Sequence, residues 1–205
     1  SYAVIPYEER LRELPSYLQQ LEMESNGKRV GSNNTPIDYD SAPVTWGALG
    51  TDAQHSFCQL LHQGTRFVPV DFIISLTPPK EYVTNHDVLL ANCIAQAKAL
   101  MIGGNSGDTN LYPYKEIIGN RPSSIISMEV LDMRTLGALI ALYEHKTYVQ
   151  SVIWKINPFD QWGVNLGKEF ATSILTDLSE GNSADQHDPS TEEQIRRYKN
   201  LRNNS

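Results

Sequence analysis

Two pairs of polar residues lie on stretches with helical spacing of apolar residues, where a fixed side chain could do chemistry. Gln20 and Glu24 are four residues apart in a leucine-rich stretch, so they share one flank of the predicted helix. A carboxylate held at a helix end beside a glutamine is a candidate general base. The same pattern is typical of a solvated helix face, which is the more frequent arrangement for such residues.

Gln161 and Lys168 form the second pair, seven residues apart. Lys168 falls on one predicted helix face with Val164 and Leu175. If that face is buried, desolvation makes the ammonium group a usable acid or charge stabiliser. In the alternative interpretation, the lysine stem follows the apolar stripe and its charge reaches solvent.

His55 lies at the entry to a predicted helix, after a loop that contains Gly47 and Gly50. Loops at strand ends are where α/β folds place ligands, so a polar ligand is expected near this histidine. His62 lies on the same helix face seven residues later. No third ligand of a suitable type is near these two histidines in the sequence, so we expect no metal site.

The segments that would position these residues alternate between helix and strand. The apolar stretch at 66–75 is nearly continuous, which is typical of a strand buried on both faces of a parallel sheet. Residues 148–156 fit a helix or a strand equally, and 103–122 form a long polar loop. Helices are predicted at 7–25, 53–62, 85–102, 163–178 and, capped by Asp132, through Tyr143, with a short amphipathic helix near Tyr198; further strands are predicted at 44–46 and 124–130. Pro15 is expected to kink the first helix or to lie near the start of a second one. Asn26-Gly27 is the expected helix stop, and Thr84 or Asn85 the expected cap of the helix at 85–102.

This pattern predicts a three-layer α-β-α sandwich with a mostly parallel sheet and a helical C-terminal tail. We expect residues 1–30 to form a helical segment that leads into the domain and carries Glu24. Residues 31–156 then form the α/β domain, and 157–205 form the C-terminal helices and tail.

Composition excludes several classes of protein. The chain has 205 residues and a net charge of −7, and an acidic chain repels phosphate backbones, so we expect no nucleic-acid partner. No apolar run approaches the ~18 residues of a membrane span. The two cysteines, Cys58 and Cys93, make no disulfide framework and fit a reducing, cytoplasmic setting.

Five strings together resemble the glucose-6-phosphate isomerase family. They follow the family's order and cover nearly the whole chain. The strings are LQQLEMESNGK at 18–28, GTDAQHSFCQLLHQGT at 50–65, GNRPSS at 119–124, TLGALIALYEHK at 135–146 and FDQWGVNLGK at 159–168.

The resemblance implies the C-terminal part of a longer protein, namely the second of two sugar-isomerase (SIS-type) domains and its tail. An absent N-terminal domain would carry the phosphate clamp and an arginine that stabilises the enediolate. The family interconverts glucose 6-phosphate and fructose 6-phosphate as a homodimer, without a metal or an organic cofactor. The chain is therefore expected to be a fragment that is inactive alone.

The resemblance also implies a role for each polar residue singled out above. Glu24 corresponds to the base that moves a proton between C2 and C1 of the sugar through a cis-enediol. His55 corresponds to the ring-opening acid/base that reaches the site from the partner subunit. Lys168 corresponds to the lysine that assists ring opening, and Gln20 and Gln161 correspond to substrate-contacting glutamines.

Two departures from the family pattern lie beside these residues. Asp52-Ala53 stands where the family has Asn-Gly, which restricts the predicted loop beside His55, and Asn165 stands where the family has a glutamate. The alternative function is a non-catalytic SIS module that binds sugar phosphates. The presence of Glu24, His55 and Lys168 together favours the enzyme.

Overall fold

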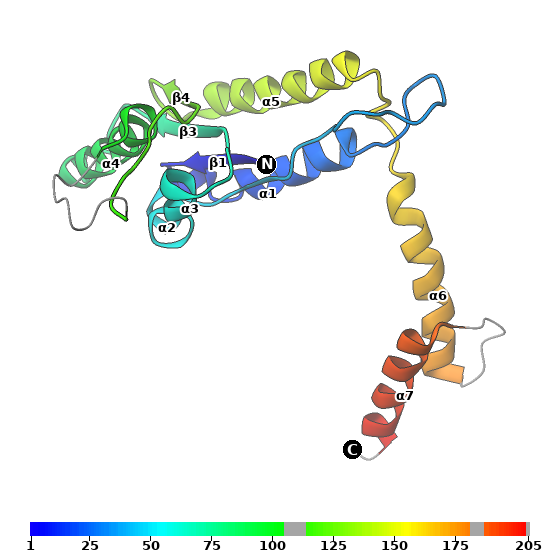
Figure 1. Ribbon diagram of the computed structural model, residues 1–205. Coiled ribbons are helices and arrows are strands. Elements are labelled where there is room, and N and C mark those ends of the chain that lie inside the picture. The colour runs from blue at the N-terminus through cyan, green and yellow to red at the C-terminus, as the bar shows by residue number, and fades with distance from the viewer. Residues whose placement is uncertain (105–113, 181–186, 204–205) are drawn as a thin grey trace. The chain divides into compact units, whose positions relative to one another are not determined.

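The structure is a computed structural model that describes residues 1–104, 114–180 and 187–203. It divides into two compact units, Ser1–Phe159 and Asp160–Ser205 (Figure 1). Within the predicted loop at 103–122, residues 105–113 lie outside the described part.

Unit 1 is built on a parallel sheet with the strand order β2-β1-β3-β4. Strand β1 was not predicted, because only three apolar residues stand between Tyr2 and Pro6, and residues 1–30 were expected to be helical. Its central place in the sheet corrects that expectation. The strands are β1 (Tyr2–Pro6), β2 (Thr45–Gly47), β3 (Val70–Ser75) and β4 (Ser123–Met128).

The helices of unit 1 lie close to the predicted ones, but their number and their bounds differ. One predicted helix at 53–62 is in fact two, because the backbone breaks at Phe57 with φ −129° and ψ 0°. The ambiguous stretch from residue 148 is helical as far as Ile153. The helices are η1 (Glu9–Leu11), α1 (Leu14–Leu18), η2 (Gln19–Glu24), α2 (Gly50–Ser56), α3 (Cys58–Gln63), α4 (Val83–Ile102) and α5 (Met133–Ile153).

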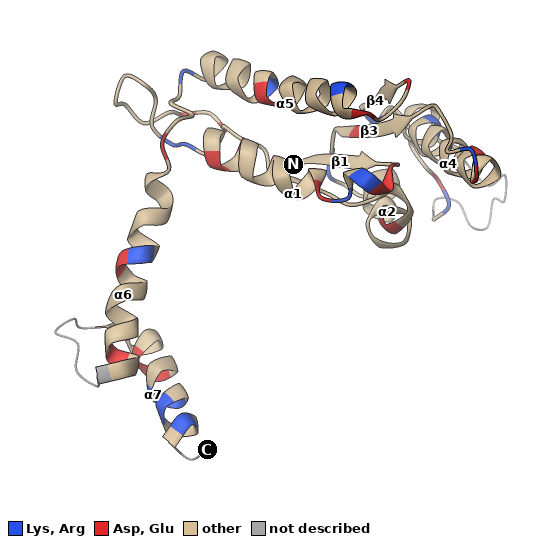
Figure 2. Ribbon diagram, turned by 180° about the vertical axis from the view of Figure 1, so that it is seen from behind, with Lys and Arg blue, Asp and Glu red and all other residues tan. Residues whose placement is uncertain are grey.

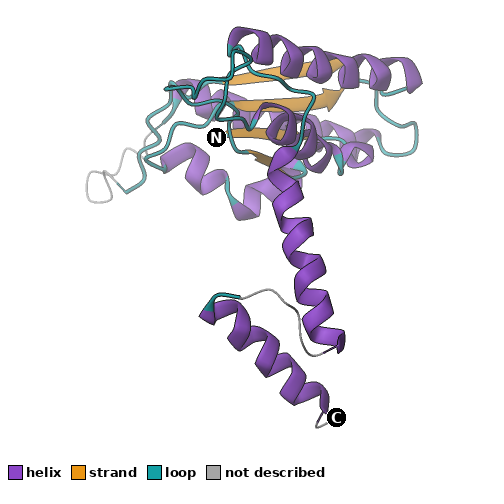
Figure 3. Ribbon diagram, turned by 90° about the vertical axis from the view of Figure 1, so that its right-hand side faces the viewer, coloured by secondary structure: helices purple, strands orange, loops and turns teal. Residues whose placement is uncertain are grey.

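Two separate cores lie on the two faces of the sheet, because successive side chains of a strand point to opposite sides. On one face, residues such as Ile5 and Phe72 pack against α2, α3 and α4. On the other face, Val4 and Ile73 pack against α1 and α5. The strands therefore lie between helices, as Figure 3 shows, which confirms the predicted three-layer sandwich.

Helix ends show where local sequence signals are reliable. Asp132 caps α5 as predicted: its carboxylate accepts from the Thr135 backbone N–H at 2.8 Å, and this bond lowers the pKa of Asp132. Pro15 occupies the first turn of α1, which was one of its two predicted places. The predicted cap of α4 at Thr84 or Asn85 is wrong, because that helix begins at Val83 without a side-chain cap.

Unit 2 contains η3 (Trp162–Val164), α6 (Asn165–Glu180) and α7 (Pro189–Asn203). His187 Nε2 lies 2.6 Å from Asp177 Oδ2 and joins the start of α7 to α6. Acidic residues lie near the start of α7 and basic residues toward its end, which complements the helix dipole (Figure 2). Among the helices that the structure describes, none is both long and apolar enough to cross a membrane.

Candidate active site

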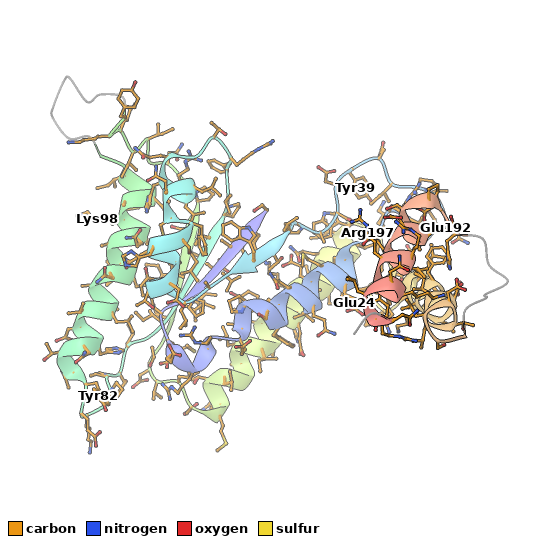
Figure 4. The ribbon with its side chains drawn as sticks, turned by 90° about the horizontal axis from the view of Figure 1, so that it is seen from below. Glu24, Tyr39, Tyr82, Lys98, Glu192 and Arg197 are labelled. Carbon is orange, nitrogen blue, oxygen red and sulfur yellow. The ribbon has the colours of Figure 1, made fainter. Side chains whose placement is uncertain are left out.

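Glu24 is the last residue of η2, a six-residue π-helical segment that continues α1. Such segments are rare and occur frequently at functional sites. Glu24 is half-buried and Gln20 is exposed, four residues earlier in the same segment. Figure 4 shows Glu24 at the end of this helical segment, away from Lys98 of α4 and from Tyr82, the residue before that helix. The structure thus brings the first predicted pair together on one element.

The chain after Glu24 closes the helix end tightly. Lys28 Nζ donates to the backbone oxygen of Glu24 at 2.8 Å, and the Gly27 N–H donates to Met23 O at 2.9 Å. A Cβ atom on Gly27 would lie 2.3 Å from that same oxygen, so only glycine fits without a shift of the backbone. The predicted helix stop at Asn26-Gly27 is confirmed, and it fixes the backbone of Glu24 from one side.

Two buried polar side chains flank Glu24, and their contacts were not predicted from the sequence. Asn26 Nδ2 donates to Thr147 O of α5 at 3.0 Å, and Glu22 Oε2 accepts from Thr45 Oγ1 at 3.0 Å. A signal was present in α5. The buried residues of this helix recur every four positions along one face, and they change from apolar to polar side chains toward its C-terminal end. Polar side chains on a buried face indicate a buried polar contact. The buried residues are Leu139, Tyr143, Thr147 and Ser151.

His55 lies in the last turn of α2 and is exposed. Two small residues let α2 pack closely against the core. A Cβ atom at Gly50 would come 2.2 Å from the Tyr7 ring, and Ala53 is fully buried in the core that contains Ile5 and Phe72. Ala53 therefore lies within a helix and not in a loop, so its departure from the family pattern does not strain the backbone beside His55. Asp52 is exposed and accepts from Arg12 Nη1 at 3.2 Å.

His55 and Glu24 are not brought together within unit 1. The helix that carries His55 packs on the sheet face of Ile5 and Phe72, whereas α1, which leads into the segment carrying Glu24, packs on the face of Val4.

Gln161 and Lys168 belong to unit 2. Gln161 precedes η3, and Lys168 lies in the first turns of α6. Both side chains are exposed within unit 2. The resemblance to the family implies that this pair shares one site with Glu24, and this stays a prediction.

A polar cavity of about 700 Å³ also lies in unit 1, between α3, α4 and residues 114–117. Its walls include Gln54, Gln59, Gln63 and His62, and His62 Nε2 lies 2.7 Å from Gln96 Oε1. None of the predicted site residues lines this cavity. In the described ranges, no three side chains from His, Cys, Asp and Glu gather into a group that could hold a metal ion.

These observations define an α/β protein with a parallel sheet covered on both faces and a polar site at the end of a fixed π-helical segment. The family model for phosphoglucose isomerase matches residues 1–195, and the chain belongs to that family.

Individual relatives agree with this assignment. A glucose-6-phosphate isomerase from Cupriavidus metallidurans is 51% identical, over 91% of this chain and 36% of that protein. One from Chlorobium luteolum is 46% identical, over 98% of this chain and 39% of that protein. The crystal structure of a glucose-6-phosphate isomerase from Chlamydia trachomatis matches 98% of this chain and 38% of its own, with 40% identity and a TM-score of 0.81. The chain thus spans less than two fifths of the length of these relatives.

Proposed function

We propose that this chain supplies the acid–base part of a glucose-6-phosphate isomerase. The observation that carries the proposal is the half-buried carboxylate of Glu24, held at the end of η2 in the string MESNGK. Membership of the phosphoglucose isomerase family and the names of the relatives support the substrate and the reaction class.

In the proposed reaction, the Glu24 carboxylate takes the proton from C2 of the open-chain aldose. The C–H electron pair becomes the C1–C2 double bond of a cis-enediol, and the carbonyl oxygen at C1 gains a proton. Glu24 then returns its proton to C1 on the same face, while the hydroxyl at C2 loses its proton and becomes the ketose carbonyl. A positioned base of this kind contributes about 10²- to 10⁴-fold in rate, and no metal or organic cofactor takes part in the proposal.

The other site residues take roles that precede or support proton transfer. His55 acts as acid and base in opening the sugar ring, since an imidazole can donate and accept near neutral pH. Lys168 assists at the ring oxygen, and Gln20 and Gln161 hold sugar hydroxyl groups. The exposure of His55 and the position of α2 support a homodimer in which this residue serves the partner's site.

The remaining length of the relatives supplies, in this proposal, the domain that clamps the sugar phosphate. The 205-residue chain is then the second SIS-type domain with its tail, part of a cytoplasmic enzyme of glycolysis and gluconeogenesis.

The test joins residues 1–205 to the N-terminal part of the Cupriavidus metallidurans relative and measures formation of fructose 6-phosphate. We expect turnover by this fused protein. Glu24→Gln should lower kcat by about 10² or more and leave KM nearly unchanged, because the amide keeps the shape but cannot accept the proton. Glu81→Gln is the matched control, since Glu81 is an exposed glutamate before α4.

Two results would count against the proposal. If exchange of the C2 proton with solvent persists in Glu24→Gln at the parental rate, Glu24 is not the base. If the fused protein binds glucose 6-phosphate without converting it, the chain is a sugar-phosphate-binding module instead.

A further inference from the structure

We propose that Glu22 and Asn26 are positioning residues, which fix the Glu24 carboxylate by fastening the chain on both sides of it to helix α5. This inference rests on the proposed role of Glu24 as the base. The two residues lie two positions before and two positions after Glu24, and both are buried, whereas Glu24 itself is only half-buried.

The first anchor is Asn26, whose exposed fraction is 0%. Its side-chain amide donates to Thr147 O, and its own backbone oxygen accepts from the Lys28 N–H at 2.8 Å. A buried amide that loses its partner but stays buried retains the cost of desolvation, so a small displacement of the segment from α5 is unfavourable. Asn26 thus holds the end of η2 against one point of the helix.

The second anchor is Glu22, whose exposed fraction is 3%. Its Oε2 atom accepts from Thr45 of β2 and lies 3.5 Å from Lys146 Nζ of α5. A buried carboxylate is stable only where an opposite charge and hydrogen bonds compensate it. Lys146 supplies the charge and Thr45 the hydrogen bond at Oε2, whereas Oε1 is buried without a hydrogen-bond partner in the described part of the chain. Through Oε2, Glu22 joins η2 to the sheet and to α5 at the same time.

Lys146 is itself held in place. Its Nζ atom lies 3.7 Å from the centre of the Tyr2 ring, a cation–π contact. The hydroxyl groups of Tyr2 and Tyr143 both donate to Asp71 Oδ2 of β3. Burial raises the pKa of both phenols, so they stay protonated and remain donors. The ammonium group that pairs with Glu22 therefore lies against a tyrosine ring that is itself held by a hydrogen bond to β3.

The two anchors end on neighbouring residues of α5, because Lys146 and Thr147 are consecutive. The backbone of Glu24 is bracketed by these contacts, and Lys28 closes it from the C-terminal side. A base must be held close to the carbon-bound proton that it removes, because a displacement of about 1 Å can cost about 10²-fold in rate. The anchors restrict movement of the backbone at Glu24 and leave the carboxylate itself accessible.

The first experiment follows hydrogen exchange of backbone amides in the 205-residue chain. In Asn26→Ala, we expect the Gly27 amide, which donates to Met23 O, to exchange about tenfold faster or more, because local opening becomes easier. The amide of Ile73, in the central strand β3, should be unchanged. Glu144→Gln is the control, since it removes only the charge of an exposed carboxylate on α5 and keeps an acceptor for the Tyr17 hydroxyl.

The second experiment measures steady-state kinetics in the fused protein described above. We expect Asn26→Ala to lower kcat by about 10- to 100-fold with KM within about twofold, since the base is displaced and the substrate contacts remain. Glu22→Gln keeps an acceptor for Thr45 and loses only the charge, so its kcat should fall less. Glu144→Gln should change neither kinetic parameter.

The outcomes separate this inference from the function on which it rests. If Glu24→Gln keeps parental activity, the proposed function fails, and the exchange data still decide whether the anchors hold the segment. If Glu24→Gln is inactive while Asn26→Ala and Glu22→Gln keep the parental kcat, the proposed function stands and the positioning role is overturned. Unchanged exchange at Gly27 in Asn26→Ala overturns it equally.

Discussion

Glu24 and His55 are carried by elements that cover opposite faces of one sheet. The leucines of the Glu24 segment, Leu18 and Leu21, pack on the face of Val4 and Ile73. Ala53, two residues before His55, packs on the other face. The sheet thus separates the two layers. If both residues act on one sugar, we infer that His55 comes from a second copy of the chain.

Mixing two inactive variants of the fused protein tests this arrangement. We expect Glu24→Gln and His55→Ala to be inactive separately and to regain about a quarter of the parental activity after subunit exchange. Random pairing gives about half heterodimers, each with one intact site of two. The measurement is fructose 6-phosphate formation before and after exchange, with each variant mixed with itself as the control. No recovery, with exchange confirmed by a size or affinity tag, would mean that each site is built within one chain.

Gly27→Ala tests the tight turn behind Glu24. The added methyl would lie 2.3 Å from Met23 O, so the backbone must move. We expect the free energy of unfolding of the 205-residue chain to fall by about 1–3 kcal/mol, and kcat of the fused protein to fall with it. Gly137→Ala is the matched control, because nothing lies within 4 Å of a Cβ atom there. Alanine in that exposed helix position should stabilise by about 0.5–1 kcal/mol. Equal effects at both positions would contradict the prediction.

Cys93 gives the chain a pH dependence whose sign follows from its burial. Burial raises the pKa of the Cys93 thiol to about 12 and also raises the pKa of the Cys58 thiol. In the unfolded chain a thiol ionises at about 8.5, so the folded state favours the neutral form. The stabilising contribution is fully present below about pH 8.5 and is lost as the pH rises toward about 12.

Two measurements check this dependence. The free energy of unfolding should fall more steeply between about pH 9 and 11 in the parental chain than in Cys93→Ala, which lacks the titrating group. Iodoacetamide at pH 8 should label Cys93 only after denaturant is added, because the thiolate is the reactive form. Rapid labelling of Cys93 in the folded chain would show that the thiol is accessible.

The parts of the fold that could be predicted are those that local pattern determines. Strand β3 was expected because its apolar stretch is nearly continuous, and helix α4 because its apolar residues recur at helical spacing. Strand β1 has too short a run for any period, and its central place is decided by pairing with β2 and β3. The break at Phe57 was missed because the helical spacing of apolar residues continues across it.

In the candidate site, too, the sequence predicted the local features and missed the contacts between distant residues. The segment with Gln20 and Glu24 was predicted as helical, and Asn26-Gly27 as its end. The partner of Asn26 lies 121 residues further along the chain, at Thr147 of α5, and no local pattern joins such distant positions. The roles given to Gln161 and Lys168 came from resemblance to the family, because seven-residue spacing on a helix is compatible with many functions.

The 205-residue chain alone should have negligible isomerase activity and should self-associate. It has the acid–base candidates, but it spans less than two fifths of the length of these relatives, and remote phosphate contacts provide binding energy that orients a substrate.

On α5, the side chains of Leu142, Val149 and Ile153 follow one another at helical spacing, and all are exposed. An exposed apolar stripe of this kind favours association. Val149→Glu should therefore reduce the apparent mass in light scattering and leave the unfolding temperature unchanged. Turnover by the chain alone at a rate near that of the fused protein would show that it holds the phosphate with its own residues.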